Sequence, residues 1–429
     1  MEAAWSGVLV GAATVLLGFL ALVLLWGSRA AGPTTDAAAA RAETAKAVAP
    51  KKGVTHHKAA PRAPLAAHHE HHPLCINTLK GHGDAVRGLA FTSDGRGLAT
   101  ACADGCVRVF KLEDLYAKSF KFLRINLPPG EIPVGVAFGE GASELVVGAQ
   151  SSSGATLSLY GQGSGTAAAQ AREQGKLPPP EVKWAKSRVH ADKGILTLHG
   201  AAATAGSGDG TAVVASCSEG TDIALFHVAD GRAVGRVDTS QLQNHMASLS
   251  PDGRFLAAAA FTADVKVWEL VLTKDGAVRD VAKVMQLKGH KGAVYWLSFT
   301  DDSKRIVTSS KDGTIKVWNI DVRYQLDEDP RCLATFPCGL PAVGKAPPHY
   351  DRIAVAPGGA LLAAAAGHTL HWLDLRTGAV LERAEHAHEG EISCLAWAPQ
   401  PRGALILATG STDKKVKLWK APPVDGESK

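Results

Sequence analysis

Short segments in which apolar and polar residues alternate recur along the chain from residue 74 to residue 421. Examples are AVRGLAF (85–91), GLATACA (97–103) and CVRVF (106–110). Because successive side chains of a strand point to opposite faces, alternation over such short stretches predicts half-buried β-strands. Turn sequences such as SDG and ADG separate the segments and predict tight hairpins. The pattern therefore predicts an all-β fold of short antiparallel strands.

Three stretches repeat one template: GHGDAVRGLAFTSDGRGLATACADGCVRVF (81–110), GHKGAVYWLSFTDDSKRIVTSSKDGTIKVW (289–318) and AHEGEISCLAWAPQPRGALILATGSTDKKVKLW (387–419). In the first two, a His precedes an Asp by 22 residues (82 to 104, 290 to 312), and a closing aromatic follows the Asp by 6 (110 and 318). The third stretch keeps the second spacing (413 to 419) and has a first hairpin three residues longer. Each repeat predicts four strands, and such a unit must stack on neighbours to bury its two apolar faces.

Four weaker copies of the template lie at residues 132–160, 190–228, 244–270 and 350–375. The seven units together predict a seven-bladed β-propeller over residues 74–421, with about 50 residues per blade. The chain reaches only the third strand of its seventh unit, so we expect CINTLK (75–80) to supply the fourth. Such closure removes the exposed sheet edges.

The Gly-His pair, the Asp before a tight turn and the closing VW or LW resemble the WD-repeat family. The resemblance implies that His, Thr, Asp and Trp form a buried hydrogen-bond network within a blade. The matching residues are His82, Thr100 and Asp104 in blade 1, His290, Thr308, Asp312 and Trp318 in blade 5, His388, Thr409, Asp413 and Trp419 in blade 7, and Trp268 in blade 4. Phe110 stands at the Trp position of blade 1, so that network is expected to be incomplete. Because a buried Asp must be fully hydrogen-bonded, these sets are interpreted as structural and not as catalytic triads.

The amino-terminal part of the chain has the composition of a membrane segment. Residues 3–27 contain no charged side chain, and GVLVGAATVLLGFLALVLLW (7–26) is 20 residues long, enough to cross a bilayer as a helix. Trp5 and Trp26 flank this run, as interfacial aromatics do. A cleaved signal peptide would need a basic start and a shorter apolar core. We therefore predict one transmembrane helix over residues 5–27, although Ser28-Arg29-Ala30 leaves a cleavage site open.

Residues 28–73 are rich in Ala, Pro, Lys and His and have no apolar periodicity, which predicts a disordered linker. Their excess of Lys and Arg places the propeller on the cytosolic side by the positive-inside rule. The run His68-His69-Glu70-His71-His72 fails the HExxH zinc motif because Pro73 occupies the second His position. No metal and no cofactor are therefore expected, and residues 422–429 are assigned to a short tail.

Composition narrows the class of protein only a little further. Apolar residues make up 46% of the chain and charged residues 20%, which supports a globular core. The net charge of +5 is mild and gives no argument for nucleic-acid binding. The seven cysteines are odd in number and form no CxxC pair, which indicates reduced thiols in a cytosolic domain.

No sequence motif indicates catalysis. The glycine-rich stretches GQGSGTAAA (161–169) and GSGDG (206–210) lack the Lys-Ser/Thr of a phosphate-binding loop, and no GxSxG motif is present. We therefore predict that the protein is not an enzyme and that it binds partners on a face of the ring. The loops that crowd the narrower, top face contain the candidate partner-binding residues Arg87, Lys291, Lys311 and Lys415, for which a solvated charged rim is the alternative interpretation.

Over residues 5–420 the chain resembles a branch of the WD-repeat family that joins a transmembrane helix, a basic linker and a propeller. The resemblance rests on CADGCVRVF (102–110), FTADVKVWELVLTKDG (261–276) and the whole of blade 5. It implies a scaffold at the cytosolic face of the endoplasmic reticulum that takes part in stress signalling and binds proteins such as a stress kinase or the ribosome; messenger RNA is a further implied partner. The main alternative is a guanine-nucleotide exchange factor for a Sar-type small GTPase, whose anchor follows its propeller. A secreted or luminal propeller enzyme would require a cleaved anchor and paired cysteines.

Overall fold

The computed structural model describes residues 72–139, 143–163, 166, 170, 173, 179–191, 193–201, 212–273, 278–341, 347–399 and 405–423. The predicted transmembrane helix (5–27) and the predicted linker up to residue 71 lie outside these ranges. Within them, no helix is long and apolar enough to cross a bilayer.

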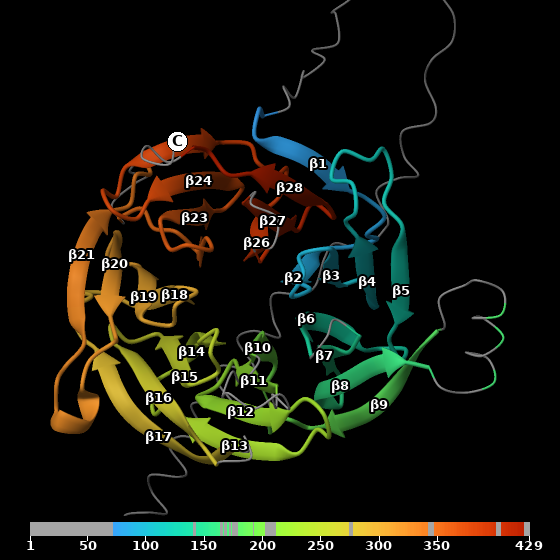
Figure 1. The fold of residues 1–429 in the computed structure, drawn as a ribbon, viewed down its shortest axis with the longest axis horizontal. Helices are drawn as coiled ribbons and strands as arrows, with labels where there is room; N and C mark the ends of the chain where they lie inside the picture. The colour runs from blue at the N-terminus through green and yellow to red at the C-terminus, as the bar shows by residue number, and fades with distance from the viewer. Residues whose placement is uncertain are drawn as a thin grey trace, which may run out of the picture. The chain divides into compact units, whose positions relative to one another are not determined.

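The described residues form seven four-stranded antiparallel sheets arranged around an axis, as Figure 1 shows. This confirms the predicted seven-bladed β-propeller. Within each blade the strands are here lettered a to d from the centre outward. Blades 1 to 3 consist of β2 (Val86–Phe91), β3 (Gly97–Cys102), β4 (Cys106–Lys111) and β5 (Phe122–Asn126); β6 (Ile132–Phe138), β7 (Leu145–Ser151), β8 (Gly154–Gln162) and β9 (Pro180–Ser187); and β10 (Ile195–Ala201), β11 (Val213–Ser218), β12 (Asp222–His227) and β13 (Ala233–Asp238).

Blades 4 to 6 follow the same order along the chain. They consist of β14 (Asn244–Leu249), β15 (Phe255–Ala260), β16 (Val265–Leu272) and β17 (Val278–Leu287); β18 (Val294–Phe299), β19 (Arg305–Ser310), β20 (Thr314–Asn319) and β21 (Arg331–Pro337); and β22 (Arg352–Val355), β23 (Leu361–Ala366), β24 (Thr369–Asp374) and β25 (Val380–Ala384). A single 3-10 turn, η2 (Tyr324–Leu326), lies in the loop between β20 and β21.

Blade 7 combines the two ends of the propeller. Its strands a to c are β26 (Ile392–Trp397), β27 (Ile406–Ser411) and β28 (Val416–Lys420), and its strand d is β1 (Cys75–Leu79). β1 pairs antiparallel with β28, with Thr78 opposite Lys417 and Leu79 opposite Val416. The predicted closure by the segment before blade 1 is therefore confirmed, and Leu79 is only 1% exposed in the resulting core.

The innermost strands form a continuous ring, in which each strand a contacts strand a of both neighbouring blades. At Gly135 of β6 the approach is close, because an added Cβ would lie 2.7 Å from the Cβ of Leu198 on β10. Only glycine fits such a contact. Larger side chains are excluded there, so this position contributes to the spacing between blades 2 and 3.

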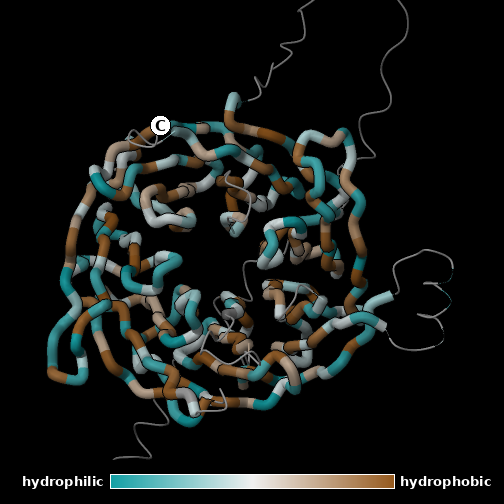
Figure 2. Tube along the Cα trace, viewed as in Figure 1, coloured by the Kyte–Doolittle hydropathy of each residue, from teal (hydrophilic) through white to brown (hydrophobic). Residues whose placement is uncertain are grey.

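Apolar clusters fill the interfaces between neighbouring blades, and each draws its residues from both. Trp268 of blade 4, for example, packs with Leu225 of blade 3. Hydrophobic positions alternate along the strands in Figure 2, whereas the loop between β20 and β21 is mostly hydrophilic. No blade buries its faces alone, so the fold is stabilised by the closed ring as a whole.

The last part of the predicted linker packs against the propeller. The ring of His72 contacts both Trp372 and Trp419, with centroids 6.0 and 5.9 Å away, and its Nε2 donates to the Arg383 carbonyl at 3.0 Å. The described part of the propeller therefore begins at His72, two residues before the predicted boundary.

Candidate functional site

The predicted His, Thr, Asp and Trp residues of blades 5 and 7 lie within hydrogen-bonding distance of one another. In blade 5, the Nδ1 of His290 is 3.0 Å from Oδ2 of Asp312 and its Nε2 is 2.7 Å from Oγ1 of Thr308. Trp318 donates its Nε1–H to the same Oγ1 at 2.9 Å. The geometry fits a neutral ring in which Nδ1–H donates to the carboxylate and Nε2 accepts the threonine proton.

Blade 7 repeats this arrangement with nearly the same distances. His388 lies 2.9 Å from Asp413 through Nδ1 and 2.6 Å from Thr409 through Nε2, and Trp419 donates to Thr409 at 2.9 Å. Each network links the loop before strand a to strands b and c of the same blade. His290 and His388 are buried, so each network connects these elements from inside the blade and stabilises their packing.

The Asp of each network is held ionised. Burial alone would raise the pKa of Asp312, but hydrogen bonds from Thr314 and from the Lys291 amide outweigh it and bring the pKa to about 2. Burial lowers the pKa of His290, a shift that the carboxylate opposes. The pair at neutral pH is therefore a neutral imidazole on an ionised carboxylate.

In blade 1 the buried Asp is bound by an arginine and not by the histidine. His82 still reaches Thr100 at 2.9 Å, but among the described residues nothing pairs with its buried Nδ1. Asp104 instead accepts two hydrogen bonds from the buried Arg108 guanidinium, at 2.7 and 3.2 Å, and one from the Gly83 amide. These bonds overcome burial and hold the pKa of Asp104 well below its usual range. The sequence shows that Phe110 replaces the Trp of this blade, but its spacing gives no sign that Arg108 binds Asp104.

Blade 3 contains a further network, which the sequence analysis missed. His190 lies 2.7 Å from Asp222 and 2.9 Å from Ser216, and Arg236 also donates to the Asp222 carboxylate. The Asp follows the hydroxyl residue by 6 positions here (216 to 222), against 4 in blade 5 (308 to 312), so it falls outside the template. Ser216 and Phe226 keep the spacing of 10 seen between Thr308 and Trp318, and that signal identifies the equivalent strands.

Trp268 of blade 4 has no equivalent network. Ala258 occupies the position ten residues before it, where blade 5 has a threonine, and Trp268 packs into the apolar cluster with blade 3. Its contribution there is apolar packing.

Two buried histidines predict acid sensitivity. Burial, with a neighbouring arginine as the second cause, lowers the pKa of His82 and of His371 from 6.5 to about 4. Below pH 6.5 the unfolded chain therefore binds protons that the folded chain does not, and the free energy of unfolding falls as the pH drops toward 4. We expect each histidine to lower the free energy of unfolding by about 2 kcal/mol at about pH 5. This follows from a pKa difference between the folded and the unfolded chain, each unit of which corresponds to about 1.4 kcal/mol.

Urea unfolding near pH 7.5 and about pH 5 measures this loss. His371→Gln removes one of the proton-binding differences between the folded and the unfolded chain. The stability that the variant loses between the two pH values should therefore be smaller than that lost by the parent protein, by about 2 kcal/mol. An unchanged loss in the variant would rule out this origin of the acid sensitivity.

The loops that carry the predicted partner-binding residues share one face. Because the strands of a blade are consecutive and antiparallel, the b–c turns and the d–a loops lie at the same end of the strands, here called the top face. Arg87 is the second residue of β2, Lys291 lies in the loop before β18 and Lys311 in the turn after β19, and all three are exposed. Lys415 is half-buried and pairs with Glu389 at 3.0 Å. The four residues belong to blades 1, 5 and 7 and form no single cluster, so partner binding by them stays a prediction.

The top face of blades 4 to 6 carries a row of rings that the sequence analysis did not identify. His245 stacks on Tyr295 with centroids 5.0 Å apart, and Tyr295 stacks on His349 at 4.6 Å. Phe261 contacts His245 edge-on at 6.1 Å and is 53% exposed. We call Phe261, His245, Tyr295 and His349 the aromatic row.

The aromatic row contains two residues from equivalent positions of neighbouring blades and two from nearby loops. His245 and Tyr295 are the second residues of β14 and β18, whereas Phe261 and His349 lie in the turn after β15 and in the loop before β22. Leu242, in the loop before β14, is 80% exposed on the same face. Phe261 and Leu242 are exposed, and the other three rings of the row, which are half-buried, support Phe261 from below. Exposed apolar side chains held in place in this way have the chemistry of a protein-docking surface.

Three segments match the WD domain, G-beta repeat family, namely residues 73–111, 282–319 and 380–420. They contain strands of blades 1, 5 and 7, the three regular repeats. The chain is 30% identical to transducin beta-like protein 2 of Homo sapiens over 361 residues, which cover 83% of this chain and 74% of the human protein. It is 28% identical to the Mus musculus protein of the same name, over 82% of this chain and 73% of that protein. A guanine nucleotide-binding protein subunit beta of Oryza sativa subsp. indica is 24% identical over 81% of this chain and 83% of that protein.

The similarity to the human protein covers 83% of the chain, and the family match falls on the three regular repeats described above. The chain therefore belongs to the transducin beta-like protein 2 family of WD-repeat proteins.

Proposed function

We propose that the protein is a scaffold that acts by binding protein partners and not by catalysis, with the top face of blades 4 to 6 as its docking surface. The observation that carries this proposal is the aromatic row, in which Phe261 remains 53% exposed beside an 80% exposed Leu242. Rigid aromatic groups lose little conformational freedom on binding and dominate the energetics of many interfaces.

Exposed charges on blade 5 support the same surface. Lys291 and Lys311 are exposed, and neither ammonium pairs with a carboxylate in the part of the chain that the structure describes. Charges at the rim of an interface steer a partner of opposite charge and add little to the affinity. The surface therefore fits a partner that presents an apolar anchor flanked by acidic residues.

Phe261→Asp in the full-length chain tests the proposal, because it places a charge at the exposed end of the aromatic row. We expect the variant to fold normally and to lose, by about tenfold or more, proteins that co-purify with the parent chain. Leu326→Asp is the matched control: Leu326 is 71% exposed and lies in a c–d loop, at the opposite end of the strands. Equal retention of the same proteins by Phe261→Asp and the parent chain would contradict the proposal.

The proposal includes a membrane tether formed by residues 5–27, with the propeller in the cytosol at the endoplasmic reticulum. Its support is the uncharged run of apolar residues and the basic residues that follow it. Protease treatment of sealed microsomes tests both parts at once. Digestion of the propeller without detergent is expected, and protection of the propeller would contradict the cytosolic orientation.

The partners implied by the resemblance are a stress kinase, ribosomes and messenger RNA, and we propose the protein partners first. Blotting the co-purified fraction for kinase and ribosomal proteins, with and without ribonuclease, separates direct binding from RNA-mediated binding. Nothing in the described part of the chain favours the exchange-factor alternative, and an assay of nucleotide release from a Sar-type GTPase tests it directly.

A further inference from the structure

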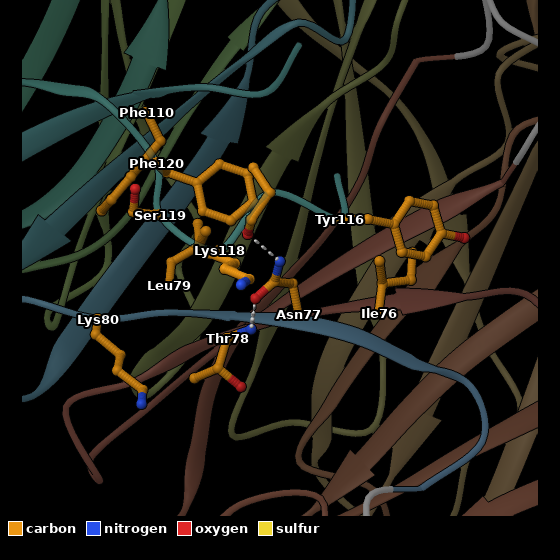
Figure 3. A pocket seen from close by; sticks show the side chains of 11 residues that line it. Ile76, Asn77, Thr78, Leu79, Lys80, Phe110, Tyr116, Lys118, Ser119 and Phe120 are labelled. Atoms are coloured by element: carbon orange, nitrogen blue, oxygen red, sulfur yellow. Dashed lines mark hydrogen bonds between the residues drawn. The ribbon is translucent and has the colours of Figure 1, made fainter. Parts of the chain in front are cut away.

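A second candidate binding site lies on the outer wall of the propeller, where the ring is closed. A cavity of about 540 Å³ separates β1 from the loop that joins β4 to β5, and Figure 3 shows the side chains that line it. We call it the closure groove. The lining residues on which its chemistry depends are Ile76, Asn77, Thr78, Lys80, Tyr116 and Lys118.

One wall of the closure groove is a sheet edge. β1 is the outermost strand of blade 7 and has β28 as its single neighbour in the sheet order. An extended segment that enters the groove therefore meets a strand whose outer edge has no strand partner in that sheet. Five residues of β1 present about 16 Å of edge, at 3.3 Å per residue, which matches a short extended peptide.

The opposite wall is fixed in place by β1 itself. The Asn77 side chain donates to the carbonyls of Leu115 and Ala117, both at 2.9 Å, and its Oδ1 accepts the Thr78 amide at 2.8 Å. These bonds hold the loop at a fixed distance from the strand, as the dashed lines in Figure 3 indicate. A partner would therefore enter a preformed groove and would not have to order the loop.

The closure groove has apolar side chains at one end and lysines along the rest, which indicates what kind of peptide it can bind. Ile76 and Tyr116 lie at one end of the groove in Figure 3 and Lys80 lies at the other, with Lys118 between them. Tyr116 is 63% exposed, and the Lys420 ammonium lies 5.3 Å from its ring centroid. Lys80, Lys118 and Lys420 pair with no carboxylate of the described residues, whereas Glu113 of the same loop is already bound to Lys111. Asp114 accepts the Tyr116 amide and shapes the turn.

We propose that the closure groove binds an extended segment of a partner protein in which acidic residues alternate with apolar ones. The segment lies along the outer side of β1, where the Thr78 amide is already bonded to the Asn77 side chain. It places an apolar side chain against Ile76 and Tyr116 and pairs its carboxylates with Lys80 and Lys118. Because β1 is the strand that closes the ring, the bound segment also stabilises closure. This site is separate from the aromatic row, so the two proposals stand or fall independently.

The probe is a fluorescent peptide of alternating Glu and Leu, six residues long, with the Lys-Leu peptide as its charge-reversed counterpart. We expect the Glu-Leu peptide to bind the full-length protein and to slow backbone hydrogen exchange in β1. Lys80→Glu with Lys118→Glu should weaken binding about tenfold or more. Asn77→Ala, which releases the loop, should weaken binding without a change of charge.

Lys183→Glu with Lys186→Glu is the matched control, because both lysines are exposed on β9, the outermost strand of blade 2. This double variant makes the same change in net charge and is expected to bind the peptide as the parent chain does. Equal weakening by both double variants would overturn the proposal, since attraction would then come from overall charge. Unchanged exchange in β1, or binding to vesicles with about 30% phosphatidylserine but not to the peptide, would also overturn it.

Discussion

A propeller that begins at Gly81 is expected to lose cooperative folding, whereas one that begins at His72 is expected to keep it. The shorter chain lacks β1, so β28 becomes an open edge and the apolar cluster between blades 7 and 1 loses Leu79. Loss of a buried leucine, of partly buried Ile76 and of a strand pairing amounts to about 5 kcal/mol or more, a large share of typical domain stability. Thermal unfolding followed by circular dichroism compares the two chains directly.

The shorter chain should also self-associate, because an open strand edge pairs with other chains. A synthetic peptide of residues 72–80 supplies the missing strand and is expected to restore part of the lost stability. Identical melting temperatures for the two chains would show that closure by β1 contributes little to the fold.

Asp312→Ala is expected to lower the free energy of unfolding by about 3 kcal/mol, the second large effect. The carboxylate accepts hydrogen bonds from the Lys291 and Thr314 amides and from the His290 ring. Its removal leaves the Nδ1–H of the buried His290 without this acceptor, which costs far more than the loss of an exposed ion pair. Urea unfolding at neutral pH measures the difference.

Asp321→Ala is the control for the Asp312 prediction. Asp321 forms an ion pair with Lys304 at 3.2 Å, in which both side chains are about 60% exposed. We expect this variant to change stability by less than about 0.5 kcal/mol. If Asp312→Ala were as mild as Asp321→Ala, the networks would not brace the blades.

The number of blades and the closing strand could be predicted because both depend on local features. The spacing of His, Asp and the closing aromatic marks strands a to c of a blade, and CINTLK stands where a missing strand is needed. The regular networks of blades 5 and 7 follow from the same spacing, because each network lies within one blade.

Two features escaped the template for physical reasons. The carboxylate of blade 3, Asp222, lies two positions later in the hairpin than its counterpart in blade 5. It still reaches the ring of His190, because the tight turn between β11 and β12 brings the start of β12 close to that ring. In blade 1, Arg108 supplies from strand c the hydrogen bonds that His82 does not give to Asp104. A search for a fixed spacing between His and Asp does not detect Asp222 or Arg108. In both blades the carboxylate keeps its hydrogen bonds, but the residues that form them differ in position or in type.

The aromatic row could not be predicted because it depends on the closed ring. His245, Tyr295 and His349 are about 50 residues apart in sequence, and only the contact between neighbouring innermost strands brings their rings together. The predicted basic residues, in contrast, lie in separate loops, and the structure spreads these loops over three blades.

Photo-crosslinking from position 261 tests the central claim most directly. A benzoylphenylalanine in place of Phe261 in the full-length chain, expressed in cells, is expected to give discrete protein adducts, and the same group in place of Leu326 is not. The adducts should disappear when Leu242 is changed to Asp, because that residue is exposed on the same face. If position 261 gives no protein adduct, or the same adducts as position 326, the top face of blades 4 to 6 is not the docking surface.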